Sequence, residues 1–167
     1  MRKIASRYSS GVDATRKCSR PAASTPPAAT RLVTTGHGAT GARAWSLRAD
    51  DVTASDNALH GLQVRSKLTG AAVTAEGNGI NGVNALEGRV RILGVTVRAN
   101  VHAGIAARRL HLDGGEVSGN NVGATGIDLY VGRRPWVRNV VCGRSVQLIM
   151  VDGGFYIGPS WHVCTDA

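Results

Sequence analysis

The sequence predicts an all-β protein, a right-handed parallel β-helix of four or five coils with a disordered N-terminal tail. Three observations support this prediction. Glycines recur at intervals of 20 to 22 residues, each glycine is followed by a short strand-like segment, and a block running from valine to asparagine recurs in the same frame. Self-similarity at a fixed period is typical of solenoids, in which each repeat packs only on its neighbours.

Residues 1–32 are expected to form the disordered tail. They contain seven Lys and Arg residues against one Asp, which accounts for +6 of the net charge of +9. Residues 18–30 are rich in Pro, Ala, Ser and Thr, as linkers are. The rest of the chain holds only +3, so no specific nucleic-acid partner is predicted for the folded part.

Residues 33–148 are expected to form the β-helix, and the glycine strand opens each coil. Apolar residues alternate after each glycine, so that Leu62 and Val64, for example, point inward while Gln63 points outward. The equivalents of Gln63 in later coils are Asn84 and Asp128, which predicts an outer polar column. The glycines are Gly41, Gly61, Gly82, Gly104 and Gly126.

The recurring block from valine to asparagine predicts a structural ladder. Asparagine tolerates the left-handed conformation that a sharp bend needs, and stacked amides can hydrogen-bond from coil to coil. We therefore expect these asparagines to be structural rather than catalytic. The valines are Val52, Val73, Val95 and Val117, and the asparagines are Asn57, Asn78, Asn100 and Asn121. A fifth block, residues 140–145, places Ser145 at the asparagine position.

A third apolar segment lies between the glycine strand and the valine block, as in residues 89–93 (RVRIL). Three short strands in each coil, separated by bends, give a triangular cross-section. Only 4% of the residues are aromatic, so the core is expected to consist of Val, Ile, Leu and Ala. No apolar run approaches the roughly 20 residues of a membrane helix, so no membrane span is expected.

Residues 149–167 break the repeat and are expected to cap the open end of the core. They bring together Phe155, Tyr156 and Trp161, and the end of a solenoid core needs such a cover. The three cysteines have neither CxxC nor zinc-ligand spacing, so no metal site is predicted. A bridge between Cys142 and Cys164 could form in an oxidising compartment, but unpaired thiols are favoured.

The blocks described above, most of them followed by Gly-Ile or Gly-Leu, resemble the right-handed parallel β-helix proteins of the pectate-lyase-like superfamily. The resemblance covers roughly residues 36–148. It implies that the segments of the 89–93 type are the first strand of each coil. Many members bind or cleave polysaccharides along that strand and the turn before it. The resemblance also implies an extracellular or cell-surface location.

Residues 133–138 (RRPWVR) resemble the Arg-x-Pro-x-x-Arg pattern of the pectate lyases. The resemblance implies that Arg138 accepts a proton and that Arg133 holds the substrate carboxylate. An arginine can act as a base only if burial and neighbouring cations lower its pKa. The chain has no acidic cluster suited to calcium, so that cofactor is expected only if the lyase alternative holds. Solvated arginines in a proline turn are the favoured interpretation.

Along the first-strand segments, alternation points cationic and aromatic side chains outward. Stacked from coil to coil, they would form a strip that holds an anionic polysaccharide by charge-assisted hydrogen bonds and stacking. An ordinary solvated face is the alternative, since charge also discourages lateral aggregation. The side chains of the strip are Arg89, Arg91, Arg109, His111, Trp136 and Arg138.

The sequence therefore predicts a secreted or surface β-helix module that contacts polysaccharide, with no evident catalysis. A polysaccharide lyase is one alternative, and a purely structural or adhesive solenoid is the other. Outside the lyase alternative no cofactor or metal is expected. The chain is expected to be a monomer or part of a longer solenoid.

Overall fold

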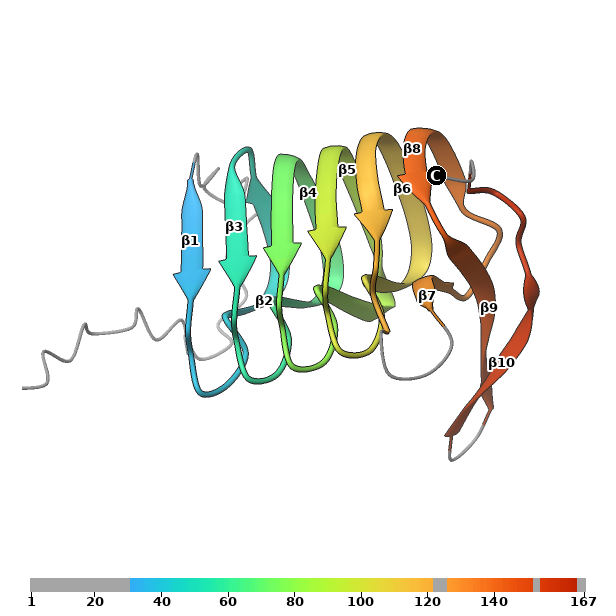
Figure 1. Cartoon of the computed structure of the whole chain (residues 1–167), viewed down its shortest axis with the longest axis horizontal. Coiled ribbons are helices and arrows are strands. Elements are labelled where there is room, and N and C mark those ends of the chain that lie inside the picture. Colours follow the sequence, from blue (N-terminus) through green and yellow to red (C-terminus); the bar gives the residue numbers. More distant parts are fainter. Residues whose placement is uncertain (1–30, 122–125, 152–153, 165–167) are drawn as a thin grey trace, which may run out of the picture.

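The protein folds into a right-handed parallel β-helix of about five coils, which confirms the predicted fold class (Figure 1). The computed structural model describes residues 31–121, 126–151 and 154–164. Within these ranges all the regular secondary structure consists of β-strands, and no helix is long and apolar enough to cross a membrane. The predicted tail lies outside the described residues, except for Arg31 and Leu32.

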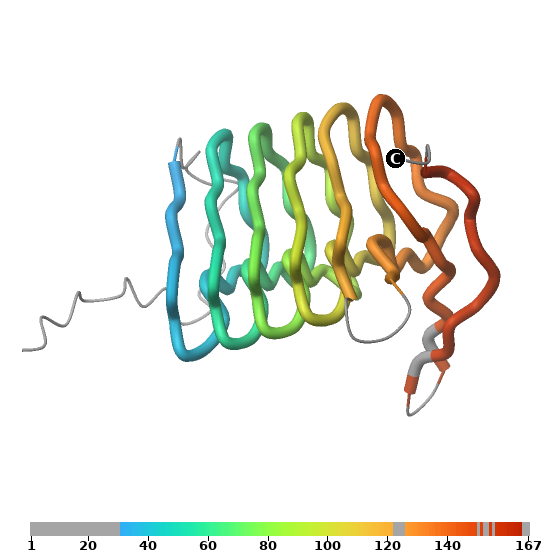
Figure 2. Tube along the Cα trace, viewed as in Figure 1, coloured from blue at the N-terminus to red at the C-terminus, as the bar shows by residue number. Residues whose placement is uncertain are grey.

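The strands form one sheet that winds around the core, and Figure 2 follows the chain coil by coil from the blue end to the red end. β4, β5 and β6 each run through most of a coil and pair in parallel with their neighbours. The strands are β1 (Leu32–Thr35), β2 (Ala42–Ala49), β3 (Val52–Ser55), β4 (Leu62–Glu76), β5 (Val83–Arg98), β6 (Ile105–Ser118), β7 (Ile127–Val131), β8 (Trp136–Cys142), β9 (Arg144–Val151) and β10 (Gly154–Ser160).

The parallel register aligns equivalent residues of successive coils into columns. Leu62 pairs with Val83, which pairs with Ile105, and all three side chains are fully buried. In the second wall Val90 pairs with Leu110 in the same way. Because successive side chains of a strand point to opposite faces, aliphatic groups fill the interior and polar groups cover the outside. Burial of one such Val, Leu or Ile contributes about 1.5–3 kcal/mol.

An asparagine ladder joins the coils at one bend. The Asn57 Nδ2 donates to Asn78 Oδ1 at 2.9 Å, and the Asn78 Nδ2 donates to Asn100 Oδ1 at 2.8 Å. Asn100 donates to Asn120 and Asn120 to the Asp128 carboxylate, both at 2.8 Å. All five side chains are buried. The predicted ladder is therefore present from Asn57 to Asn100, and beyond Asn100 it continues through Asn120 to an aspartate that was not predicted from the sequence.

The predicted register is wrong at the end of β6. Val117 pairs with Val97, so Gly115 takes the position that was predicted for Val117. Asn120, five residues after Gly115, joins the ladder in place of the predicted Asn121. Asn121 follows it with a φ of 58°, in the left-handed conformation that asparagine tolerates.

A shortened bend causes this shift. Ala85 pairs with Ala107 and Arg89 pairs with Arg109. The first members of these pairs are four positions apart and the second members only two, so the bend of β6 lacks two residues. Every later position of that coil therefore comes two residues earlier than an even period predicts.

The next bend is longer, which displaces the predicted fifth glycine. Ile105 pairs with Leu129, so Asp128 rather than Gly126 takes the place of the recurring glycine. Asn120 precedes Leu129 by nine residues, whereas five residues separate the corresponding positions of the preceding coil. The bend therefore contains four additional residues.

Two further predictions fail with this register. Asp128 is 2% exposed, so it does not belong to an outer column with Gln63 and Asn84; Tyr130 takes that outward position. Ser145 lies in β9 instead of the ladder, and its buried hydroxyl has no hydrogen-bond partner among the described atoms.

The C-terminal segment covers the last coil and is bound to it covalently. Cys142 and Cys164 form a disulfide, so the expectation of unpaired thiols is wrong. The Trp161 indole packs against the core and donates to the Val131 carbonyl at 3.2 Å. β10 pairs antiparallel with β9, which crosses the predicted end of the repeat at residue 148. Tyr156 points to solvent and is 65% exposed.

Replacement of Asn78 by Ala should lower the free energy of unfolding by about 3 kcal/mol, because buried donors and acceptors lose their partners. The backbone N–H and the Nδ2 of Asn57 both donate to the Asn78 Oδ1 that this variant lacks. Urea unfolding followed by circular dichroism measures the loss. Thr74→Ala, an outward change on the same coil, is the control at about 0.5 kcal/mol or less. Equal losses in the two variants would contradict a stabilising ladder.

Replacement of Cys164 by Ser should lower the free energy of unfolding by about 3 kcal/mol, the loop-entropy value for residues about 22 apart. Guanidinium unfolding of the wild type with reductant should show a similar loss. Cys18→Ser should unfold like the wild type and keep the response to reductant. A Cys164→Ser variant as stable as the oxidised wild type would show that the bridge does not stabilise the cap.

Candidate functional site

One outer wall carries a group of stacked cations that we call the cationic face. It is formed by outward side chains of β2, β4, β5, β6 and β8, in the stretches of the 89–93 type. Their neighbours in the chain, such as Val90 and Leu110, are buried in the core, and alternation therefore turns these side chains outward. The face consists of Arg48, Lys67, Arg89, Arg91, Arg109, His111, Trp136 and Arg138.

The parallel register divides the face into columns across the coils. Lys67 pairs with Arg89, which pairs with Arg109. In the neighbouring column Arg91 pairs with His111, and His111 pairs with Trp136. Paired residues lie about 4.8 Å apart along the axis. The structure thus brings together all five side chains that the sequence assigned to substrate binding.

Two members of the face were missed in the sequence. Arg48 pairs with Thr69, which pairs with Arg91, so Arg48 extends one column toward the N-terminal end. Lys67 extends the other column in the same direction. Both residues lie in the third apolar segments of the first coils. Their alignment with the later cations can be recognised only once the pairing register is known.

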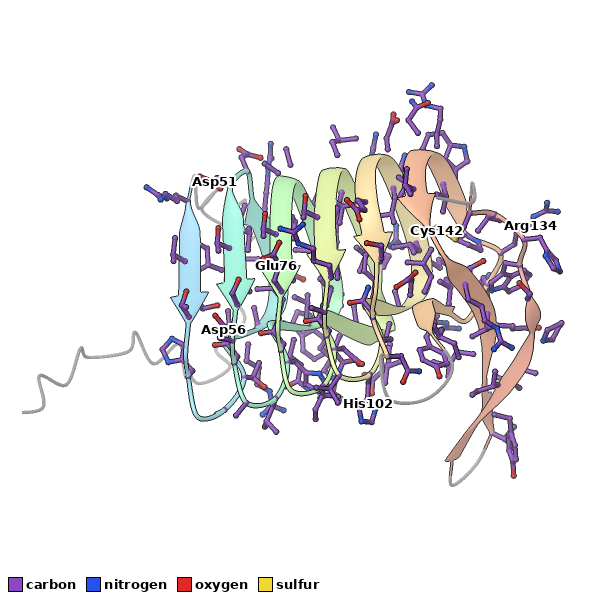
Figure 3. All side chains as sticks on the ribbon, in the orientation of Figure 1. Asp51, Asp56, Glu76, His102, Arg134 and Cys142 are labelled. Atoms are coloured by element: carbon purple, nitrogen blue, oxygen red, sulfur yellow. A yellow bond between two sulfur atoms is a disulfide. The ribbon has the colours of Figure 1, made fainter. Side chains whose placement is uncertain are left out.

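No acidic side chain of the described residues forms an ion pair with the cations at the centre of the face. The ion pairs of the described residues are Arg31–Asp51, Arg65–Glu87, Arg98–Glu76 and Arg138–Asp113. Lys67, Arg89, Arg91 and Arg109 are exposed and belong to none of them. Figure 3 shows the labelled Glu76 on the wall formed by β1, β3 and the ends of β4–β6, where it binds Arg98.

An aromatic pair lies at the C-terminal end of the face. The rings of His111 and Trp136 are stacked, with centroids 3.9 Å apart and an interplanar angle of 18°. Trp136 remains 44% exposed, and the Arg138 guanidinium lies 5.5 Å from its ring. Desolvation lowers the pKa of His111, and Arg91 and Arg138 lower it further, whereas Asp113 opposes them.

Arg138 is held by an acidic neighbour. Its Nη2 lies 2.5 Å from Asp113 Oδ2, and its Nε donates to Oδ1 of the same carboxylate at 3.2 Å. Asn139 adds a third bond to Asp113, at 3.2 Å. These contacts lower the pKa of Asp113, and the hydrogen bond that Arg138 donates to Asp113 raises the pKa of Arg138.

This contact bears on the lyase alternative. A base must have a pKa low enough to accept a proton, but Asp113 stabilises the charged form of Arg138. Arg133 is an exposed residue between β7 and β8, and the labelled Arg134 projects outward from the last coil in Figure 3. Among the described residues, no group of three or more His, Cys, Asp or Glu side chains could hold a metal ion.

Replacement of Trp136 by Ala should raise the pKa of His111 toward the ordinary histidine value, because the stacked indole contributes to the burial that lowers it. A titration of the imidazole C–H signals by NMR measures this change. Trp45→Ala, at an exposed residue of β2, is the matched control. An unchanged His111 pKa in the Trp136 variant would mean that the stack does not desolvate the imidazole.

Comparisons with protein-family models, with curated proteins and with solved structures found no match. The β-solenoid architecture therefore rests on the structure itself, and the resemblance to the pectate-lyase-like superfamily stays a prediction.

Proposed function

We propose that the protein is a non-catalytic β-helix module that binds anionic polysaccharide through the cationic face. The observation that carries this proposal is the register of Lys67, Arg89 and Arg109, exposed cations on successive coils that form no ion pair within the described part of the chain. Their spacing along the axis, about 4.8 Å, is close to the length of one sugar residue in an extended chain. A polysaccharide lying along the axis would present its anionic groups to them in turn.

The stacked pair gives the face a second means of binding. Sugar rings have apolar C–H faces that pack on aromatic rings, and Trp136 is partly exposed beside the cation columns. Arginines can form paired hydrogen bonds with carboxylate or sulfate groups. A ligand that carries both sugar rings and anions would therefore use both parts of the face.

The disulfide supports the location that this function requires. Bridges such as Cys142–Cys164 persist mainly in oxidising environments, outside the cell or at its surface. Such a location is also what the resemblance to the pectate-lyase-like superfamily implies. We therefore propose a secreted or surface-exposed module of that kind.

Replacement of Arg89, Arg91 and Arg109 together by Gln should weaken binding to polygalacturonate about tenfold, since each exposed ionic contact contributes about 0.2–1 kcal/mol. Isothermal titration calorimetry at low and moderate salt measures the affinity. Added salt should weaken polygalacturonate binding by the wild type more than binding by the variant, because salt screens the ionic contacts that the variant lacks.

A matched control removes the same charge elsewhere. Arg43, Arg98 and Arg144 lie outside the cationic face, and their joint replacement by Gln should leave most of the affinity intact. Neutral dextran should not bind either variant or the wild type. Equal weakening in the two triple variants, or no binding of polygalacturonate by the wild type, would contradict the proposal.

A further inference from the structure

We propose that His111 makes binding at the cationic face proton-linked: it is a neutral stacking group in the free protein and becomes a cation when a polyanion occupies the face. Affinity for polyanions then rises as the pH falls. This inference rests on the proposed function and adds a mode of regulation to the same site.

The position of His111 carries this inference. It lies in a column between Arg91 and Trp136, in the midst of the face rather than at its edge. One side of the imidazole is covered by the Trp136 ring at 3.9 Å, but the residue remains partly accessible. A charged imidazole at this point would join the cations of neighbouring coils to those of the last coil.

The charged groups around His111 come from three strands. β5 supplies Arg91, β6 supplies Asp113, and β8 supplies Arg138. Asp113 is the one acidic group among them, and it is engaged by Arg138 and Asn139. Arg91 and Arg138 therefore disfavour a further positive charge, which agrees with the lowered pKa of His111.

A bound polyanion reverses this balance. Its negative groups offset the charge of Arg91 and interact directly with a protonated imidazole, so the pKa of His111 is higher in the complex than in the free protein. The complex then binds more protons than the free protein, and affinity increases as the pH falls between the two pKa values. The gain levels off below the pKa of the free protein, which lies below the ordinary value of about 6.5.

Dextran sulfate is the appropriate probe, because its sulfate esters stay ionised throughout this range and any pH dependence then comes from the protein. The affinity should be measured at constant ionic strength from pH 7.5 to pH 5. We expect the wild type to gain about fivefold or more over this interval. His111→Phe, which keeps a flat ring against Trp136 but cannot take up a proton, should change by less than about twofold.

The control variant is His102→Phe, which should keep the pH dependence of the wild type. His102 lies at the bends along the lower edge of Figure 3, away from the cationic face. In addition, NMR titration of the His111 imidazole should show a higher pKa with dextran sulfate than without it. Circular dichroism at each pH confirms that the variants are folded.

The outcomes separate the two proposals. If dextran sulfate binds and His111→Phe retains the pH dependence of the wild type, the proton-linked role is wrong while the binding face stands. If the His111 pKa does not rise on binding, the same conclusion follows. If the wild type binds neither dextran sulfate nor polygalacturonate at any pH, both proposals fall.

Discussion

The asparagine ladder is the interaction on which the rest of the structure depends. Every amide in it points the same way, with its Oδ1 accepting from the preceding coil and its Nδ2 donating to the next. In this protein the chain ends in a group that only accepts. Asp128 is that group, since Oδ1 receives Asn120 and Oδ2 receives the backbone N–H of Gly143 at 2.8 Å. An asparagine at this position would have only one side-chain oxygen for these two donors. Its NH₂ group would therefore face either the N–H of Gly143 or the NH₂ of Asn120, and neither can accept a hydrogen bond. Burial raises the pKa of Asp128, but these donors oppose that effect.

The ladder also explains the strongest signal in the sequence. A Cβ on Gly61 would lie 2.8 Å from the Asn78 Nδ2, and one on Gly82 would lie 2.9 Å from the Asn100 Nδ2. The ladder amides and the carbonyls of the next coil occupy the space that a side chain would need. The recurring glycines are therefore a consequence of ladder packing, although in the sequence they look like simple turn residues. Their regular recurrence marks the coils in which the ladder bend has constant length.

This relationship sets the limit of what sequence alone could predict. The three walls and the ladder as far as Asn100 follow from alternation and period, because successive coils there differ in length by only one residue. β6 loses two residues in one bend, and the chain gains four in the next. Val117, Asn121 and Gly126 still fit an even spacing, yet the hydrogen-bond register replaces them by Gly115, Asn120 and Asp128. Bends absorb such changes without disturbing the walls, so apolar periodicity does not reveal them. The Cys142–Cys164 bridge depends in the same way on how the cap folds back.

The register bears on function through the placement of charge. Like charges directly opposite one another on adjacent strands are destabilising, whereas opposite charges stabilise. Two other pairs of this chain follow that rule: Glu76 lies opposite Arg98 on another wall, and Asp113 lies opposite Arg138 at the C-terminal end of the cationic face. On the cationic face Arg89 lies opposite both Lys67 and Arg109, which folding alone does not favour. A polyanion along the axis would offset this repulsion on the three coils that carry Lys67, Arg89 and Arg109. This repulsion, which is confined to one wall, is the physical reason why we propose a ligand for the face rather than ordinary solvation.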